Sequence, residues 1–394
     1  MTLRLTRRGF LLGLAASAAP GRTRIAFART AGERRLVVVI LRGALDGLYA
    51  VQPYGDPALA GLRAPLVLPE PGQEGGLLDL GGFFGLHPAL PTLHALYAAG
   101  EALLLHAVAG PYRSRSHFEA QDFLESGAGE RLTSGWLNRA LAGLPNPAEV
   151  RAGIVIGGGL PLLLRGQTPV SAYAPPGLEP PAPELLYRIA ELHATDPLLG
   201  RVVGEGMRAR GFAAQTLGAP STEERQRRAF PRLAAAAGRL LAAADGPRVA
   251  AMELGGWDTH AAQPQRLAPA LHALDDGIAA LREELGPAWA RTAVLVITEF
   301  GRTARVNGNT GTDHGTGGVA FLLGGAVAGG RVVADWPGLA EGRLLEGRDL
   351  MPTLDLRRVA KGLLRDHLRL PEAAVSLAFP GSAAAPALAG LVRA

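Results

Sequence analysis

The sequence predicts an α/β fold, a three-layer α/β/α sandwich around a mostly parallel central sheet with a helical insertion. Short runs of branched apolar residues recur along the chain, as expected of strands buried on both faces. They cover residues 36–41, 102–107, 154–156, 248–254, 293–298 and 318–323. Helical patterns separate several of these runs, at residues 89–99, 117–125, 267–285 and 352–368. Buried strands alternating with helices are typical of a parallel sheet covered on both faces.

The first 28 residues resemble a twin-arginine export signal. Arg7 and Arg8 lie in the sequence TRRGFL, and the apolar stretch that follows at 10–19 is shorter than the ~20 residues needed to span a membrane. Small residues flank Phe27 where a signal peptidase would cut, which predicts a mature start near Arg29. We expect the twin-arginine translocase to export the folded chain to the periplasm or the extracellular space. An uncleaved anchor or an amphipathic helix is the alternative; after cleavage no stable membrane anchor is expected.

The amino-acid composition argues against several classes of function. The formal net charge is +5, but residues 1–28 contain five arginines and no acidic residue, so the remainder carries equal numbers of basic and acidic residues. This balance argues against a nucleic-acid partner, which normally requires a clustered basic surplus. The chain has no cysteine, which excludes zinc–thiolate sites and cysteine nucleophiles.

Beyond the signal, residues 29–394 are expected to form one large α/β domain. Residues 52–85 are rich in Gly and Pro and predict a long excursion from the sheet. Residues 181–246 follow a proline-rich stretch and contain only helical patterns, which predicts a helical insertion.

Polar clusters adjoin five of the predicted strands. In open parallel sheets, ligands bind beyond the carboxyl ends of the strands, and the clusters are expected at that rim. In chain order their candidate residues are Asp46, then Ser114, Arg115, Ser116 and His117, then Asp258 and His260, then Glu299 and Arg302, and finally His314, just before the last run.

These residue types fit metal-assisted chemistry on an anion. Aspartate, glutamate and histidine suit Zn²⁺, Mn²⁺ or Mg²⁺, and Asp258 and His260 project to the same side if the extended strand continues. A serine at a helix start is placed to attack an anionic ester, and arginines clamp its oxygens. Taken singly, each residue has a structural alternative: Ser116, with Glu119 three residues later, also fits a capping box.

The order of these residues resembles the alkaline phosphatase-like superfamily. More narrowly, residues 42–47, 115–122, 256–260 and 298–303 resemble a twin-arginine-exported family of unknown function grouped with that superfamily, over nearly the whole mature chain. The resemblance implies that Asp46 binds one metal ion. It implies that Asp258, His260 and His314 bind the other.

In the same resemblance, Glu299 takes the place of an aspartate that is usually followed by histidine. Residue 300 is Phe, so the second metal lacks one ligand unless His117 or Asp313 supplies it.

The sequence therefore predicts a metal-dependent hydrolase of a small anionic ester, phosphate before sulfate, with one or two Zn or Mn ions. The nucleophile is Ser116, with Ser114 as the alternative, or a metal-bound hydroxide; His117, Arg115 and Arg302 complete the catalytic set. The alternative is a non-catalytic binding or assembly protein of the cell envelope, which Phe300 favours. The other histidines are assigned structural roles.

Overall fold

The computed structural model describes residues 33–145, 152–173, 222–244 and 246–393. The predicted signal peptide at 1–28 and much of the predicted insertion at 181–246 lie outside the described residues. In the described part of the chain, no helix is long and apolar enough to cross a membrane.

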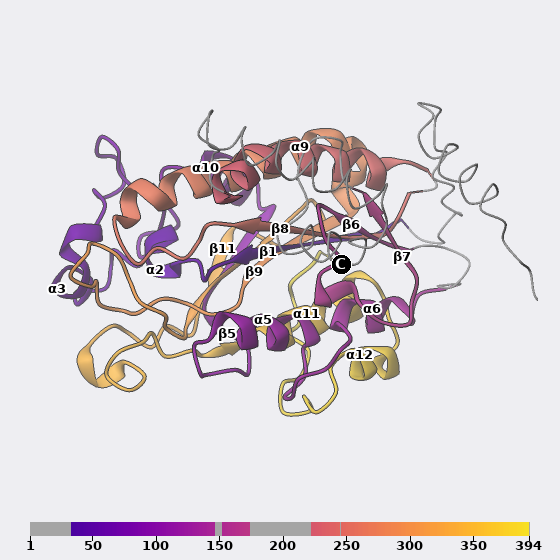
Figure 1. Cartoon of the computed structure of the whole chain (residues 1–394). Helices are drawn as coiled ribbons and strands as arrows, with labels where there is room; N and C mark the ends of the chain where they lie inside the picture. Colours follow the sequence, from indigo (N-terminus) through magenta and orange to yellow (C-terminus); the bar gives the residue numbers. More distant parts are fainter. Residues whose placement is uncertain (1–32, 146–151, 174–221, 245, 394) are drawn as a thin grey trace, which may run out of the picture.

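A central sheet of nine strands organises the described residues (Figure 1). Its order is β11-β5-β10-β9-β1-β8-β6-β7, and β12 also pairs with β5. The bounds are β1 Arg35–Arg42, β5 Ala102–Ala109, β6 Gly153–Ile156, β7 Val170–Tyr173, β8 Val249–Gly255, β9 Thr292–Thr298, β10 Gly318–Leu323, β11 Arg331–Val333 and β12 Leu354–Asp355. Neighbouring strands are parallel, except that β10 is antiparallel to β5 and β9. The predicted fold class, with its mostly parallel sheet, is confirmed.

Helices cover both faces of this sheet, which makes the three layers (Figure 1). One face packs against α4 (Pro91–Ala98), α9 (Thr222–Ala242) and α10 (Gln263–Leu285). The other packs against α6 (Trp136–Leu141), α11 (Leu356–Gly362) and α12 (Glu372–Ala378), with α5 (His117–Ser126) on the same side. Alternate residues of β1 explain the two cores: Val37 and Val39 face the first, and Val38 faces the second.

Helix α9 falls within the predicted insertion. Its residues Phe230, Ala234 and Leu241 are buried in the same core as α10 and β1. This part of the segment therefore belongs to the covering layer of the sheet. The excursion at 52–85 contains α3 (Leu59–Arg63). Strands at its two ends, β2 (Val51–Gln52) and β4 (Gly85–Leu86), form a small antiparallel sheet with β3 (Leu78–Asp79).

The direction of β10 determines which chain segments meet at the edge of the sheet where the polar clusters lie. Because β10 runs opposite to β5 and β9, its amino end lies beside their carboxyl ends. The segment that precedes β10, which includes His314, therefore lies at the same edge as the residues that follow β1, β8 and β9.

Candidate metal centre

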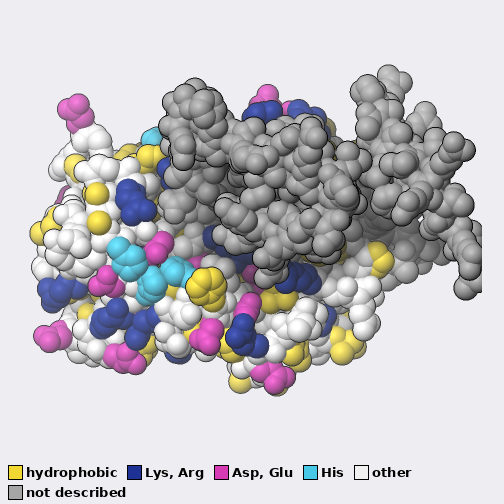
Figure 2. All heavy atoms as spheres, viewed as in Figure 1, with side chains coloured by type: hydrophobic (Ala, Val, Ile, Leu, Met, Phe, Trp, Pro, Cys, Tyr) yellow, Lys and Arg dark blue, Asp and Glu magenta, His cyan; other side chains and the backbone are white. Residues whose placement is uncertain are grey.

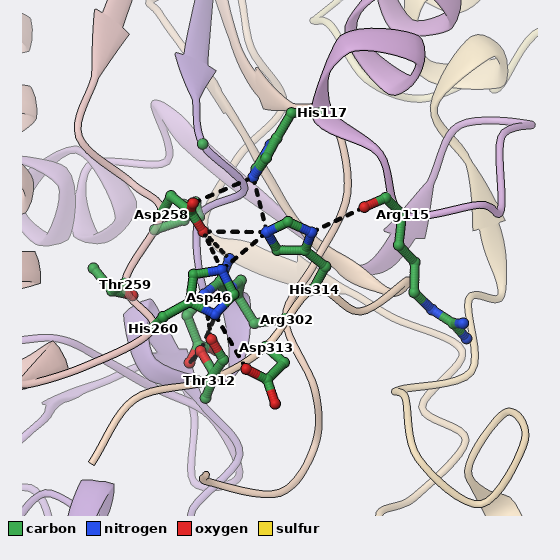
Figure 3. Close-up of polar contacts among 12 residues, drawn as sticks. Asp46, Arg115, His117, Asp258, Thr259, His260, Arg302, Thr312, Asp313 and His314 are labelled. Carbon is green, nitrogen blue, oxygen red and sulfur yellow. Dashed lines mark hydrogen bonds and ion pairs between the residues drawn. The ribbon is translucent and has the colours of Figure 1, made fainter. Parts of the chain in front are cut away.

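Three histidines and one aspartate converge at this rim (Figure 3). His117 is the first residue of α5, Asp258 and His260 follow β8, and His314 precedes β10. Asp258 and His260 flank Thr259, which is fully buried, so the two side chains emerge together on the accessible side.

The ligand atoms of these residues lie close to one another. The Nε2 atom of His314 is 3.0 Å from the Nε2 atoms of both His117 and His260. The nearest Asp258 oxygens lie 3.0 Å from the Nε2 atom of His260, 3.3 Å from that of His314 and 3.6 Å from that of His117. Ligands about 2.0–2.1 Å from a tetrahedral zinc ion are separated by about 3.3 Å. His117, Asp258 and His314 have ligand atoms that all lie within 4.8 Å of one another, and His260 adds a fourth donor beside Asp258 and His314.

The outward-facing nitrogens have acceptor partners, so the inward-facing ones are lone pairs whenever the rings are neutral. The Nδ1 atom of His314 lies 2.9 Å from the carbonyl oxygen of Arg115, which only accepts hydrogen bonds, so this Nδ1 carries the proton. The Nδ1 atoms of His117 and His260 lie 2.8 and 3.1 Å from carboxylate oxygens of Glu299 and Asp313. When the rings are neutral, this arrangement directs unprotonated Nε2 atoms at one another and at a carboxylate. A divalent cation fits that donor set, and the outer acceptors are the usual partners of metal-bound histidines.

Glu299 orients His117 from behind. Its carboxylate is buried, and Oε1 also accepts from the backbone N–H of Gly43 at 2.9 Å and from Gln121 at 3.1 Å. Although burial disfavours the charged form, these hydrogen bonds, first among them the one from His117, hold the pKa of Glu299 below its usual range. Gly43 is required here because its φ is +117° and an added Cβ would lie 2.7 Å from the backbone nitrogen of Asp258.

The electrostatics of the centre favour a charged imidazole when no cation is bound. Burial lowers the pKa of His117, but hydrogen bonds to Asp258 and Glu299 outweigh it and raise that pKa to about 9. The pKa of Asp258 lies well below its usual range, against the effect of burial, because hydrogen bonds with His117, His314 and Arg302 favour its charged form.

The centre is accessible from outside. The exposed fractions of the four side chains are 22% for His117, 27% for His314, 38% for Asp258 and 44% for His260. Figure 2 shows histidines together on this face, beside acidic and basic side chains. Phe300 is buried and packs on the rings of His117 and His314, with centroids 4.9 and 5.2 Å apart. It therefore fixes the ring positions.

Asp46 forms its hydrogen bonds with residues other than the three histidines and Asp258. Its carboxylate is buried and accepts two hydrogen bonds from Arg63, at 2.8 and 3.1 Å, and one from Gln263 at 2.7 Å. Neither Asp46 nor Glu299 belongs to the group His117, Asp258 and His314, whose ligand atoms all lie within 4.8 Å of one another. The structure thus gives Asp46 a buried ion pair and Glu299 an outer contact, where the sequence predicts ligands.

The two predicted arginine clamps are engaged by carboxylates. Arg302 is buried and donates to Asp258 at 2.5 Å, so it positions that ligand. Arg115 donates to Asp349 at 2.8 Å and to Glu346 at 2.6 Å. Figure 3 shows its guanidinium directed away from the centre and its carbonyl directed toward His314.

The two predicted nucleophiles lie next to His117 in the chain. Ser116 is the N-cap residue of α5, but its side chain makes no capping hydrogen bond. The capping box is absent, because the carboxylate of Glu119 bonds to the hydroxyl of Tyr112 instead. The Ser116 hydroxyl is therefore not committed to the helix end; Ser114 is exposed. Their catalytic roles stay predictions.

A cavity of about 260 Å³ adjoins the centre. Its wall includes Asp313, which contacts His260, and Arg348, which donates to the carbonyl of His314 at 2.8 Å. Leu62, Val306 and Leu344 add nonpolar surface, and Arg305, also in the wall, is exposed. The cavity wall therefore combines basic, acidic and nonpolar side chains next to the centre.

Sequence reasoning missed Arg63 and Asp349. Arg63 lies in the Gly- and Pro-rich excursion, where no pattern marks it, and its role depends on a contact with Asp46. Asp349 is fully buried and accepts from Arg115 and Thr316, both at 2.8 Å. An aspartate with no motif around it gives no sequence signal for such a role.

The family model described as "Protein of unknown function (DUF1501)" matches residues 103–376. No curated protein matches the chain.

Solved structures with some similarity include a protein in the alkaline phosphatase superfamily from Vibrio parahaemolyticus, at 12% identity and a TM-score of 0.33, covering 81% of this chain and 69% of that one. The C-terminal periplasmic domain of EcEptC from Escherichia coli, in complex with Zn, has 10% identity and a TM-score of 0.37, covering 76% and 75%. The phosphonate monoester hydrolase of Agrobacterium radiobacter has 12% identity and a TM-score of 0.31, covering 86% and 74%.

Proposed function

The chain belongs to the DUF1501 family of proteins of unknown function, and we propose that this member is a metal-dependent hydrolase of small anionic esters, phosphate before sulfate. The observation that carries the proposal is the convergence of the Nε2 atoms of His117, His260 and His314 on Asp258, within 3.0–3.6 Å. Partly exposed lone pairs in that arrangement are stabilised by a cation and leave room for a substrate.

The donor set favours one ion of Zn or Mn. Three imidazoles and one carboxylate match the preferences of these metals. A second ion has little support, because the carboxylates of Asp46 and Glu299 are taken by Arg63 and His117. When bound, such an ion would polarise the ester and lower the pKa of the nucleophile.

The chain's own residues position the reactants. Glu299 holds the ring of His117, Arg302 holds Asp258, and Phe300 packs behind two of the rings. The amino end of α5 carries partial positive charge, which favours an anionic substrate beside Ser116. We assign the attack to the Ser116 hydroxyl and the binding of the organic group to the cavity between Arg305 and Arg348.

One observation favours a second function. The guanidinium groups of Arg115 and Arg302 are bound to carboxylates, so neither is free to stabilise charge on a transferring group. A metal-containing binding or assembly protein of the cell envelope needs no such clamp. This is the alternative function.

Export to the periplasm or the extracellular space through the twin-arginine translocase is part of the proposal. It rests on Arg7 and Arg8 in TRRGFL. Changing both to Lys should leave the precursor in the cytoplasm, because a receptor reads the pair. Accumulation of the double variant outside the cytoplasm, seen by cell fractionation, would exclude this route.

The experiment that separates the two functions measures metal content and turnover together. The purified chain, supplied with Zn²⁺ or Mn²⁺, is assayed on an aryl phosphate, a phosphodiester and an aryl sulfate. We expect His314→Ala to lose both metal and activity, and Ser116→Ala to lose activity but keep metal. His272→Ala, an exposed histidine on α10, is the matched control and should keep both. Folded, metal-loaded wild-type protein that is inert on all three esters would favour the binding function.

A further inference from the structure

A second large cavity lies at the opposite end of the central sheet from the metal centre. Its volume is about 760 Å³, within the range of roughly 300–1,000 Å³ typical of small-molecule sites. Arg34, Arg248 and Arg291, which precede β1, β8 and β9, contribute to its wall, and so does the C-terminal segment. Strand β1 alone, with 8 residues, separates the two ends of the sheet by about 25 Å.

The wall of this cavity is strongly basic. Among the described residues that line it, five are arginines and one is acidic: Arg34, Arg248, Arg291, Arg369, Arg393 and Glu33. The single carboxylate, that of Glu33, is paired with Arg291. The cavity therefore carries a clear excess of positive charge.

Hydrogen bonds to backbone carbonyls hold two of these arginines in place without neutralising them. Arg34 donates to the carbonyls of Asp366 and His367, both at 3.1 Å. Arg393 donates to the carbonyls of Val327 and Gly100 at 2.9 and 2.8 Å. The two cationic groups are thus ordered before any ligand binds, which reduces the entropy lost on binding.

The buried groups of the wall respond to this positive field. His367 is 2% exposed, and burial together with the charges of Arg34, Arg248 and Arg369 lowers its pKa to about 4. Burial and the charges of Arg35 and Arg34 also lower the pKa of Arg248. Like charges held this close repel one another, and an anion in the cavity would relieve the repulsion.

Arg369 is held in a backbone conformation that side chains rarely adopt. Its φ is 58°, and such left-handed residues other than glycine are strained and tend to occur at functional sites. Its side chain is exposed at the cavity. Within the described part of the chain, it makes no salt bridge.

We propose that this basic cavity binds a small organic polyanion that carries at least two phosphate or carboxylate groups. Guanidinium groups bind both kinds of oxyanion in a bidentate manner. Leu144, Leu368 and Val392 in the wall provide contacts for a nonpolar part of the ligand. The site is separate from the metal centre and does not depend on the hydrolase function.

Isothermal titration calorimetry of the purified full chain tests the proposal, with pyrophosphate and citrate as probes. At least one probe should bind with one-to-one stoichiometry, and the stronger probe identifies phosphate or carboxylate as the preferred group. Arg369→Gln and Arg291→Gln should each weaken binding at least tenfold. His314→Ala should leave binding unchanged, which separates this cavity from the metal centre.

Two further variants keep the test decisive. Arg369→Gly removes the side chain and relieves the left-handed strain, so it should fold and still weaken binding. Arg239→Gln removes an exposed arginine that pairs with Glu284 on the helical layer and should bind normally. The proposal is overturned if neither probe binds to wild-type protein. It is also overturned if Arg239→Gln weakens binding as much as Arg369→Gln, because the attraction would then be non-specific.

Discussion

The Glu299→Gln variant should weaken metal binding at least tenfold without changing the fold. The side chain is isosteric, so its oxygen can keep the three donors that Oε1 receives from His117, Gly43 and Gln121, at 2.8, 2.9 and 3.1 Å. The new amide nitrogen then faces Thr298 Oγ1, which lies 2.9 Å from Oε2. That hydroxyl can donate instead to the carbonyl of Leu41, at 2.7 Å.

What the variant loses is the negative charge behind His117. A charge-assisted hydrogen bond is roughly twice as strong as a neutral one, and outer-shell partners of metal-bound histidines typically change metal affinity by about 10- to 100-fold. That range corresponds to about 1.4–2.7 kcal/mol. The effect should approach the upper end, because Glu299 is buried and its charge is poorly screened.

Competition with a chromogenic chelator measures the affinity, and Asp313→Asn provides the matched comparison. Asp313 supports His260 in the same way, at 3.1 Å, but its side chain is 54% exposed. Its replacement should therefore lower affinity less than about fivefold. Equal affinities for wild-type and Glu299→Gln proteins would refute the role of Glu299, and so would a larger loss in Asp313→Asn.

Three other perturbations test different parts of the structure. Gly311→Ala should reduce metal content although it changes no ligand, because the added Cβ would lie 2.2 Å from the backbone carbon of His260; metal analysis checks this. Arg63→Met should lower the free energy of unfolding by about 3–5 kcal/mol in urea titrations, because it leaves the buried carboxylate of Asp46 unpaired. The free energy of unfolding should fall as the pH falls from 6.5 toward 4, because buried His106 has a pKa of about 4 and takes up its proton mainly in the unfolded chain. In urea titrations this free energy should decrease by about 1.4 kcal/mol per pH unit for each such histidine.

The rim could be predicted from the sequence because each polar cluster adjoins a buried apolar run. The run at 318–323 fits a strand of either direction, so the sequence alone did not indicate that β10 is antiparallel. That direction arises from pairing with β5 and β9, and it brings His314 to the centre. The order of the clusters along the chain could be predicted from the sequence. The strand pairing that brings them together could not.

The ligand set could be predicted only in part. Asp258, His260 and His314 lie where their motifs place them, at one rim. His117 is next to the predicted nucleophile and suggests a catalytic role; its position among the ligand atoms depends on ring contacts with Glu299 and Phe300. These depend on tertiary packing, which motif spacing does not encode.

The same limit applies to Asp46. A first-strand aspartate resembles a metal ligand in the sequence, but its carboxylate meets Arg63, which belongs to the excursion at 52–85. Only the fold brings Arg63 against the end of β1. A residue whose function is set by a distant, unpatterned partner cannot be assigned from its own motif.

An anomalous difference map from crystals of the zinc-loaded protein would test the central claim most directly. We expect one strong peak about 2.0–2.2 Å from the Nε2 atoms of His117, His260 and His314 and from a carboxylate oxygen of Asp258. The same map from His314→Ala crystals should lack it. A zinc peak bound instead by Asp46, or no peak at these four residues in fully loaded wild-type crystals, would contradict the metal centre described above.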